Sequence, residues 1–502
     1  MSERIAAALA ALVASGGLLS NSTNGLATPL LLPGEEPAAT TEHHVKASGR
    51  LLNYTAEVGR VAIRDVETGE PHGYMGYVAY RMDVSGTARP IMFLWNGGPG
   101  ADSALLHFEL AGPKRADGDH LVDNAETWLT AADLVFVDPI GTGFSRPAKA
   151  EYADEFYGTV GDVDSVAEFV RAWRLLHDAQ EHATFLVGES WGAPRAASVG
   201  ASLLQRGISV DGLVLISGGT GLTQTHAAPA LTAALRVIDM AQVALHHRKS
   251  AAELGTDREA IARAAEDWAR RSYAPALARI DNLSAGERTM IAEKLAHFTG
   301  IPVAQIDRKT LIVTPRQFRN ELLKEQGKTL YLFDMRRVSA LPTHYEPAVL
   351  RYLRGDLGHR TSLPYIGLEP VETGYAPHGK YPESVNSRWN YATGPVTPEM
   401  VKEAMAAASK SGDGPPRLGP PLPGAEAAMA LNPKLKILVA SGLYDGGSIC
   451  AANDEIARSL PDPLQQAMEF KCYAGGHMLY RDEPARMQFT RDVKAFVAAG
   501  RR

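Results

Sequence analysis

Residues 184–206, TFLVGESWGAPRAASVGASLLQR, decide the fold. The pattern predicts a buried strand over TFLVG, a sharp turn at Ser190 and a helix over residues 192–206. In that order of elements, the serine hydroxyl projects above the carboxyl end of the strand. Gly188 and Gly192 are needed because side chains there would collide across the turn. Ser190 is therefore the candidate nucleophile, against the alternative of one more serine in a glycine-rich loop.

Strand and helix patterns alternate around this stretch. Continuous apolar runs predict buried parallel strands at 90–95 and 133–137, and a helical period at 163–177 precedes a further strand at 212–219. Such alternation predicts a parallel sheet with helices on both faces. Before it, alternating residues within 43–82 predict antiparallel entry strands.

The sheet pattern then stops for about two hundred residues. Five segments in this interval have a helical period, with Gly and Pro between them: 227–247, 257–272, 285–297, 315–326 and 346–357. A Pro/Gly-rich linker follows at 411–424, and strand patterns return at 436–442 and 467–476. We therefore expect an α/β fold with a doubly wound, mostly parallel sheet and an inserted helical lid.

The predicted organisation has four parts. They are a leader at 1–40, the first part of the α/β core at 41–220, the helical lid with its linker at 221–430, and the second part of the core at 431–502.

The leader contains the short apolar run 5–19, followed by a small-x-small cleavage pattern at 25–27. This predicts a signal peptide and an exported protein, periplasmic or secreted. Arg4 is the only basic side chain before the run and Glu3 offsets it, so an Ala-rich leader on a cytoplasmic protein stays open.

Composition excludes several classes of partner. A formal net charge of −6 provides no basic field for nucleic acid. No stretch beyond the leader is long and apolar enough to span a bilayer. We expect no cofactor and no metal, since there is no P-loop and the spacing around Cys450 and Cys472 is not that of a metal site. These two cysteines form either one disulfide or two free buried thiols.

A serine hydroxyl needs a base to take its proton, and the base needs an acid to fix its tautomer. Asp445 follows the strand at 436–442, and His477 follows the last predicted strand. Both positions are strand exits on the same edge of the sheet as Ser190. We therefore expect Ser190, Asp445 and His477 to form a catalytic triad.

The tetrahedral intermediate also needs two backbone N–H donors at its oxyanion. The loop 96–100, NGGPG, follows the strand at 90–95, and its glycines allow the backbone to approach a substrate. We assign the donors to the N–H groups of Gly98 and Trp191.

Together these motifs resemble the serine carboxypeptidase family, which has the α/β-hydrolase fold, and in particular its bacterial branch. The resemblance runs in order from about residue 50 to 497 and rests on five stretches: FLWNGGPG (93–100), WLTAADLVFVDPIGTGFS (128–145), GESWG (188–192), ASGLYD (440–445) and AGGHM (474–478). It implies an acyl-enzyme mechanism that releases the C-terminal amino acid of a peptide at acidic pH.

The resemblance also implies that Asn96 and Glu189 hold the substrate's C-terminal carboxylate. A glutamate can hydrogen-bond a carboxylate only when one of the two is protonated, so this pairing favours acidic conditions. The chain departs from the family in several places, two of which concern carboxylates. Asp102 has no family counterpart, and the E-x-G-P stretch that contains Glu109 has one residue too many, which leaves the roles of both open.

An esterase or an acyltransferase on the same scaffold is the alternative, because fold and triad do not fix the acyl acceptor. A catalytically silent binding protein is opposed by the intact triad and glycine loops. The lid should shape side-chain preference, but its sequence does not predict which residue is released.

Overall fold

The computed structural model describes residues 37–82, 88–223, 227–368, 385–411, 418–447 and 450–500. Residues 1–36 of the predicted leader lie outside these ranges, as do residues 412–417 of the predicted linker.

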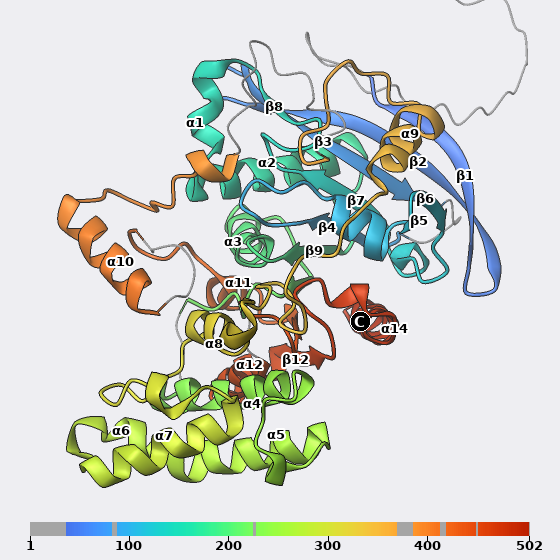
Figure 1. The fold of residues 1–502 in the computed structure, drawn as a ribbon. Coiled ribbons are helices and arrows are strands. Elements are labelled where there is room, and N and C mark those ends of the chain that lie inside the picture. The colour runs from blue at the N-terminus through green and yellow to red at the C-terminus, as the bar shows by residue number, and fades with distance from the viewer. Residues whose placement is uncertain are drawn as a thin grey trace, which may run out of the picture. The chain divides into compact units, whose positions relative to one another are not determined.

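Ten strands of the described chain form one sheet (Figure 1). In spatial order they are β1 (Ala39–Ala47), β2 (Arg50–Arg64), β3 (Pro71–Arg81), β7 (Asp133–Asp138), β4 (Ile91–Trp95), β9 (Thr184–Glu189), β10 (Gly212–Ile216), β11 (Lys436–Gly442) and β12 (Met468–Tyr473), with β8 (Arg146–Pro147) beside β3. A separate hairpin contains β5 (Lys114–Asp117) and β6 (His120–Asp123).

The first strands form an antiparallel meander, and β3 also pairs antiparallel with β7. From β7 to β12 every pairing is parallel. The predicted doubly wound, mostly parallel sheet is confirmed, with an antiparallel entry as the alternating pattern indicated.

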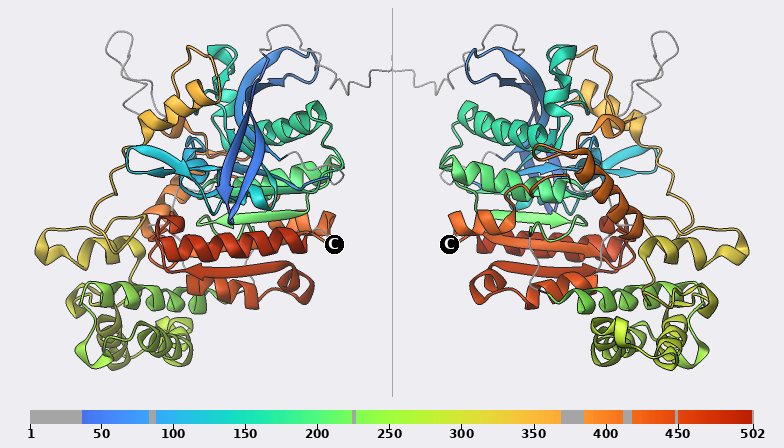
Figure 2. Two further views of the ribbon diagram at one scale, coloured as in Figure 1. Left: turned by 90° about the vertical axis from the view of Figure 1, so that its right-hand side faces the viewer. Right: turned by 90° about the vertical axis from the view of Figure 1, so that its left-hand side faces the viewer.

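Helices cover both faces of the sheet (Figure 2). One face packs against α2 (Thr159–Leu176), α3 (Gly192–Gln205), α11 (Ala425–Leu431) and α13 (Asp462–Ala467). The other packs against the π-helical turn η1 (Leu106–Ala111), α9 (Glu346–Arg351), η9 (Tyr352–Asp356) and α14 (Glu483–Ala499). Strand residues alternate between the faces, as Met92 and Phe93 do, and both faces are apolar because both are buried.

The helices of the insertion share an apolar cluster, which also takes in Leu443, Tyr444 and Cys450 from the last part of the chain. These helices are α4 (Pro229–His246), α5 (Arg258–Trp268), η5 (Ala269–Tyr273), α6 (Ala274–Ala278), α7 (Ala285–Thr299) and α8 (Pro315–Glu321). All five predicted helical segments contain a helix, but α9 and η9, in the last one, pack against the sheet instead of the other lid helices. Further helices are α1 (Ala153–Phe156), α10 (Pro398–Ser411) and α12 (Cys450–Arg458).

Cys450, the first residue of α12, and Cys472 in β12 form a disulfide with their Cα atoms 5.7 Å apart. This decides between the two alternatives for the cysteines. The bond joins a helix to a strand, and Cys472 is exposed while Cys450 is buried.

The described residues belong to one compact unit, and the division into core and lid remains a prediction. No helix among the described residues combines the length and apolar character needed to cross a membrane.

Candidate active site

Ser190 lies on a strained turn between β9 and α3. Its φ of 59° is in the left-handed region that residues other than glycine rarely adopt. The Ser190 N–H donates to Ile216 O at 2.8 Å, and Ser190 O accepts from Ala193 N at 3.0 Å. A Cβ on Gly188 would overlap the carbonyl of Gly192. The glycine therefore lets strand and helix approach closely enough to hold the serine in this conformation.

Asp445 and His477 follow β11 and β12, as the sequence predicted, and the structure brings them together. His477 Nδ1 lies 2.7 Å from Asp445 Oδ2, and both side chains are buried. Asp445 Oδ1 accepts from the Gly447 N–H at 2.8 Å. Burial by itself lowers the pKa of His477, but the charge and hydrogen bond of Asp445 outweigh it and raise the pKa above its ordinary value.

The end of β10 connects Ser190 to His477. Ile216 accepts the Ser190 N–H, and Ser217 Oγ donates to His477 O at 2.7 Å. Within the described ranges, Ser190 Oγ and His477 form no hydrogen bond; Ser190 follows β9 and His477 follows β12, with β10 and β11 between them in the sheet. This contact is often long in unliganded enzymes and tightens when substrate binds.

The predicted oxyanion loop lies against the serine turn. A Cβ on Gly97 would overlap the Trp191 nitrogen, so the two loops touch through backbone. Gly98 has a φ of 96°, which favours glycine. No bond from the N–H of Gly98 or Trp191 to another group forms among the residues that the structure describes. Both predicted donors are therefore available to a ligand.

Asn96 and Glu189 also meet. Asn96 Nδ2 donates to Glu189 Oε2 at 2.6 Å, and the Tyr480 hydroxyl donates to the same oxygen at 2.7 Å. The Leu106 N–H fixes Asn96 by donating to its Oδ1 at 3.1 Å. Glu189 Oε1 is buried and has no hydrogen-bond partner in the described part of the chain. One oxygen of the carboxyl is thus saturated and the other is not.

This environment favours a protonated Glu189. Burial raises its pKa from 4.5 to about 7, and the charge of Glu109 adds to the rise. His477, Tyr480 and Arg481 oppose it. Because Oε2 already accepts two hydrogen bonds, Oε1 is the oxygen that can carry the proton.

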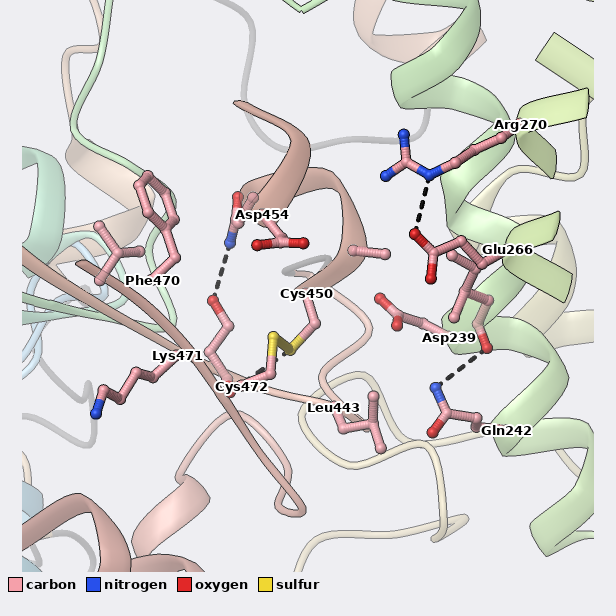
Figure 3. Close-up of a pocket in the computed structure, with 15 residues that line it drawn as sticks. Asp239, Gln242, Glu266, Arg270, Leu443, Cys450, Asp454, Phe470, Lys471 and Cys472 are labelled. Carbon is pink, nitrogen blue, oxygen red and sulfur yellow. Dashed lines mark hydrogen bonds and ion pairs between the residues drawn. A yellow bond between two sulfur atoms is a disulfide. The ribbon is translucent and has the colours of Figure 1, made fainter. Parts of the chain in front are cut away.

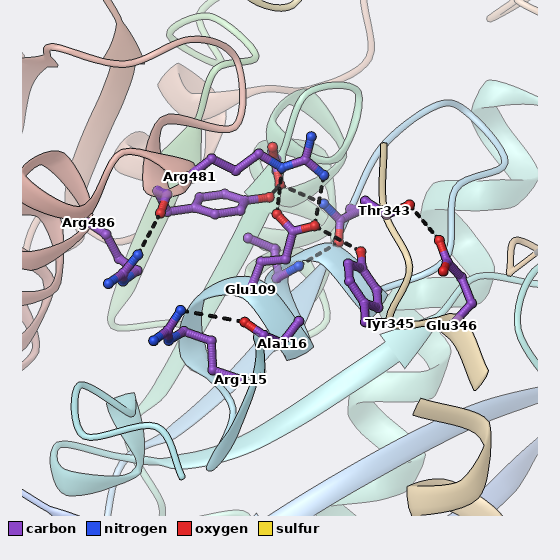
Figure 4. A network of polar contacts seen from close by, with 12 residues as sticks. Glu109, Arg115, Ala116, Thr343, Tyr345, Glu346, Arg481 and Arg486 are labelled. Carbon is purple, nitrogen blue, oxygen red and sulfur yellow. Dashed lines mark hydrogen bonds and ion pairs between the residues drawn. The ribbon is translucent and has the colours of Figure 1, made fainter. Parts of the chain in front are cut away.

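Glu109 forms an ion pair next to this group (Figure 4). Arg481 donates through Nε and Nη2 to its two oxygens at 2.6 and 2.7 Å, and the Tyr345 hydroxyl donates at 2.8 Å. The surplus residue of this stretch falls in the π-helical turn η1, a type of turn that holds one more residue than an α-turn. Glu109 therefore pairs with an arginine and affects Glu189 through its charge.

Sequence reasoning missed Tyr480, Arg481 and Arg195. Arg195 on α3 donates through Nη1 to the carbonyl of Asn96 at 2.7 Å and through Nε to Asp162 at 2.6 Å, and both charged groups are buried. It thereby anchors the oxyanion loop to the helix that follows the serine. Tyr480 and Arg481 follow closely after His477 in the sequence, and this closeness could have indicated that they lie near the site. No feature of the sequence indicated a role for Arg195.

Asp102 is buried, and its charged neighbour is Asp138. Its Oδ1 accepts from Ala104 N at 2.8 Å, and Ser103 donates through N and Oγ to Asp138 Oδ1, also at 2.8 Å. Burial raises the pKa of Asp102 to about 7, with a further rise from the charge of Asp138. Asp102 therefore contributes to the support of the loop. No group of three His, Cys, Asp or Glu side chains suited to a metal occurs among the described residues.

The fold and the serine turn define the class. A serine on a strand–turn–helix above a mostly parallel sheet, followed in the chain by an acid and then a histidine, is the arrangement of the α/β-hydrolases. The sequence model of the family "Serine carboxypeptidase" matches residues 66–207. The predicted resemblance is therefore confirmed over a segment that includes Asn96, Glu189 and Ser190, while Asp445 and His477 lie outside it.

Relatives match over limited lengths. A pheromone-processing carboxypeptidase KEX1 of Colletotrichum graminicola is 33% identical over 129 residues, 24% of this chain and 20% of the relative. Serine carboxypeptidase-like 45 of Arabidopsis thaliana is 23% identical over 203 residues, 34% of this chain and 42% of the relative. The chain thus matches less than half the length of each relative.

Among solved structures, the prohormone-processing carboxypeptidase KEX1(delta)p of Saccharomyces cerevisiae aligns with a TM-score of 0.48 and 14% identity. The alignment covers 89% of this chain and 91% of that one.

Proposed function

We propose that the protein is a serine carboxypeptidase that releases C-terminal amino acids from peptides through an acyl-enzyme. The observation that carries this proposal is the pair Asn96 and Glu189 next to the Ser190 turn, with Glu189 Oε1 buried and unpaired within the described chain. An amide and a protonated carboxyl are donors suited to a carboxylate. The substrate of an esterase need not contain a free carboxylate, and without one it offers no group for this pair to bind.

In this mechanism Ser190 Oγ attacks the carbonyl carbon of the last peptide bond. His477 Nε2 takes the hydroxyl proton and gives it to the leaving amine, while Asp445 holds the imidazole in the required tautomer. The N–H groups of Gly98 and Trp191 stabilise the oxyanion. Water then attacks the acyl-enzyme with His477 as base, which releases the shortened peptide and restores Ser190.

Protonation of Glu189 controls substrate binding in this scheme. A protonated Oε1 donates to the terminal carboxylate, whereas an ionised Glu189 repels it strongly in a buried setting. His477 must be neutral to act as base. The pKa of Glu189 is about 7 and that of His477 is raised, so the two groups compete for a proton near neutral pH. In the productive form this proton is on Glu189, and His477 is neutral.

A matched pair of peptides tests the proposal. One ends in a free carboxylate and the other in a carboxamide, and loss of the last residue is followed by mass spectrometry. We expect rapid trimming of the free peptide, much slower trimming of the amide, and no trimming of either by Ser190→Ala. Equal rates on both peptides, or cleavage inside the chain, would favour an esterase or an endopeptidase.

We also propose that the protein is exported, periplasmic or secreted. The disulfide between Cys450 and Cys472 supports this, because disulfides persist in oxidising compartments. Fractionation of expressing cells, with N-terminal sequencing of the product, tests it. A full-length product in the cytoplasm would contradict it.

A further inference from the structure

A cavity lies between the lid helices and the end of the sheet, and Ser190 is not among the residues that line it. Its volume is 310 Å³, and α4, α5, β11, α12 and β12 supply most of its walls. None of the residues assigned above to catalysis or to carboxylate binding lines it. Its apolar surface includes Leu443, Phe470 and the disulfide (Figure 3).

Asp239 of α4 is the unusual group in this cavity. The residue is only 5% exposed, and neither carboxylate oxygen has a hydrogen bond of full geometry within the described part of the chain, although the backbone amides of Cys450 and Ala451 lie close enough to lower its pKa. Figure 3 shows the carboxylate turned from α4 toward α12 and the disulfide. Burial raises its pKa to about 7; the amides of Cys450 and Ala451 and the charge of Arg236 lower it less, and Asp445 adds to the rise. The amides and Arg236 offset the cost of burial only in part, so a cation beside Asp239 would stabilise its charged form.

The cations that line the cavity are already bonded to other carboxylates. Arg270 contacts Glu266 at 2.9 Å and Glu455 at 2.7 Å. Lys471 contacts Glu469 at 3.0 Å and Asp492 at 3.1 Å. Among lining carboxylates, Asp454 pairs with Arg458 and Glu266 with Arg270. Asp239 is thus the lining carboxylate without an ion pair among the described residues.

Two neutral acceptors complete the polar wall. Asn453 Nδ2 donates to Ser441 Oγ at 2.9 Å, and Gln242 Nε2 donates to Ile238 O at 3.3 Å. Both amides therefore keep a carbonyl oxygen for a ligand. One carboxylate with two amide oxygens suits the N–H donors of an ammonium group, and the described residues contain no metal-type cluster.

We propose that this cavity binds a small alkylammonium ion, whose N–H groups donate to Asp239 and whose carbon chain contacts Leu443 and the disulfide. The volume is at the lower end of the range for small-molecule pockets, about 300 to 1,000 Å³, which matches a ligand the size of a basic side chain. The proposal is independent of the hydrolase activity.

Calorimetry with pentylamine and its neutral analogue 1-pentanol, above the pKa of Asp239, tests this. The wild type should bind pentylamine with a dissociation constant of about 1 mM or tighter and bind 1-pentanol at least about tenfold more weakly. Asp239→Asn should lose at least about tenfold in amine affinity. Asp454→Asn, a matched change on the same wall, should stay within about twofold of wild type.

Ala451→Leu, which fills the cavity without changing charge, provides an independent arm and should also weaken amine binding. Thermal melts by circular dichroism establish that each variant is folded. Equal binding of amine and alcohol, unchanged amine affinity in Asp239→Asn, or no binding by the wild type up to about 10 mM would each overturn the proposal.

Discussion

Phe333, a residue of the inserted segment, packs its ring against that of His477, with the ring centroids 4.8 Å apart. Its carbonyl oxygen accepts the His477 backbone N–H at 2.7 Å, and Gly446, next to Asp445, donates to Leu332 O at 2.9 Å. The insertion therefore holds the backbone of the proposed base and of the residue that follows the proposed acid, while the Phe333 ring packs against the imidazole.

Phe333→Ala should expose His477 to water. Because burial lowers the pKa of this histidine, reduced burial should raise that pKa further and move the acid limb of kcat to higher pH. We expect a loss of about three- to tenfold in kcat below neutrality, and recovery at higher pH. Phe333→Leu keeps the cover and should resemble wild type. A kcat profile in Phe333→Ala identical to wild type would remove the ring from this role.

Ser190→Ala and His477→Ala should each abolish nearly all turnover, with losses on the order of 10⁴-fold or more. The double variant should be no worse than either single one, because the two side chains act as a unit. Peptide hydrolysis and thermal melts measure activity and folding on the same samples. Substantial activity in clean Ser190→Ala would show that the triad is assigned wrongly.

Glu189→Gln should change the pH dependence of KM. Wild-type KM should rise as pH passes about 7, where Glu189 ionises, whereas a glutamine amide donates to the substrate carboxylate at any pH. The variant should also show the acid limb of kcat at lower pH, since the charge of Glu189 raises the pKa of His477. If KM of Glu189→Gln follows the wild-type curve, Glu189 does not bind the substrate carboxylate.

Glu109→Gln and Arg481→Met should shift the pKa of Glu189 in opposite directions. The charge of Glu109 raises that pKa and the charge of Arg481 lowers it. The alkaline rise in KM should therefore begin at lower pH in Glu109→Gln and at higher pH in Arg481→Met. Arg486→Met is the matched control, because Arg486 pairs with Glu126 at 2.8 Å instead. Shifts of the same sign in both test variants would contradict this electrostatic account.

Asp102 should make the fold less stable as pH rises. Its pKa is about 7 in the folded protein and near 3.8 in an unfolded chain, so the folded state binds the proton more tightly. The unfolding free energy should then fall between about pH 4 and pH 7, by up to about 1.4 kcal/mol per pH unit for one proton. Denaturant titrations should show a shallower slope in Asp102→Asn and an unchanged slope in the exposed control Asp117→Asn.

Local patterns predicted the sheet and the serine turn well. The run at 436–442 coincides with β11, and the helix predicted at 192–206 is α3. Both were predictable because the spacing of apolar residues and the positions of glycines determine secondary structure over short stretches of chain. The pairing of Asp445 with His477 followed from a topological rule, since the exits of neighbouring parallel strands meet at one edge.

Contacts between distant segments were not predictable in the same way. An arginine on a helix, such as Arg195, looks like any solvated helical residue until the fold places Asn96 and Asp162 beside it. The bonding of Cys450 and Cys472 likewise depended on where α12 and β12 come to lie. Contacts between side chains from distant segments depend on the packing of the whole fold, and they produce no repeating pattern in the sequence from which they could be predicted.

The number of residues in the π-helical turn η1 determines the direction in which the Glu109 side chain points. Removing one residue from this turn, Ala111 for example, would return it to α-helical winding and rotate the preceding side chains by about 100° relative to Gly112. Glu109 would then face away from Arg481 with no change in its own identity. A single deleted codon, rather than a substitution, would therefore be enough to separate Glu109 from Arg481.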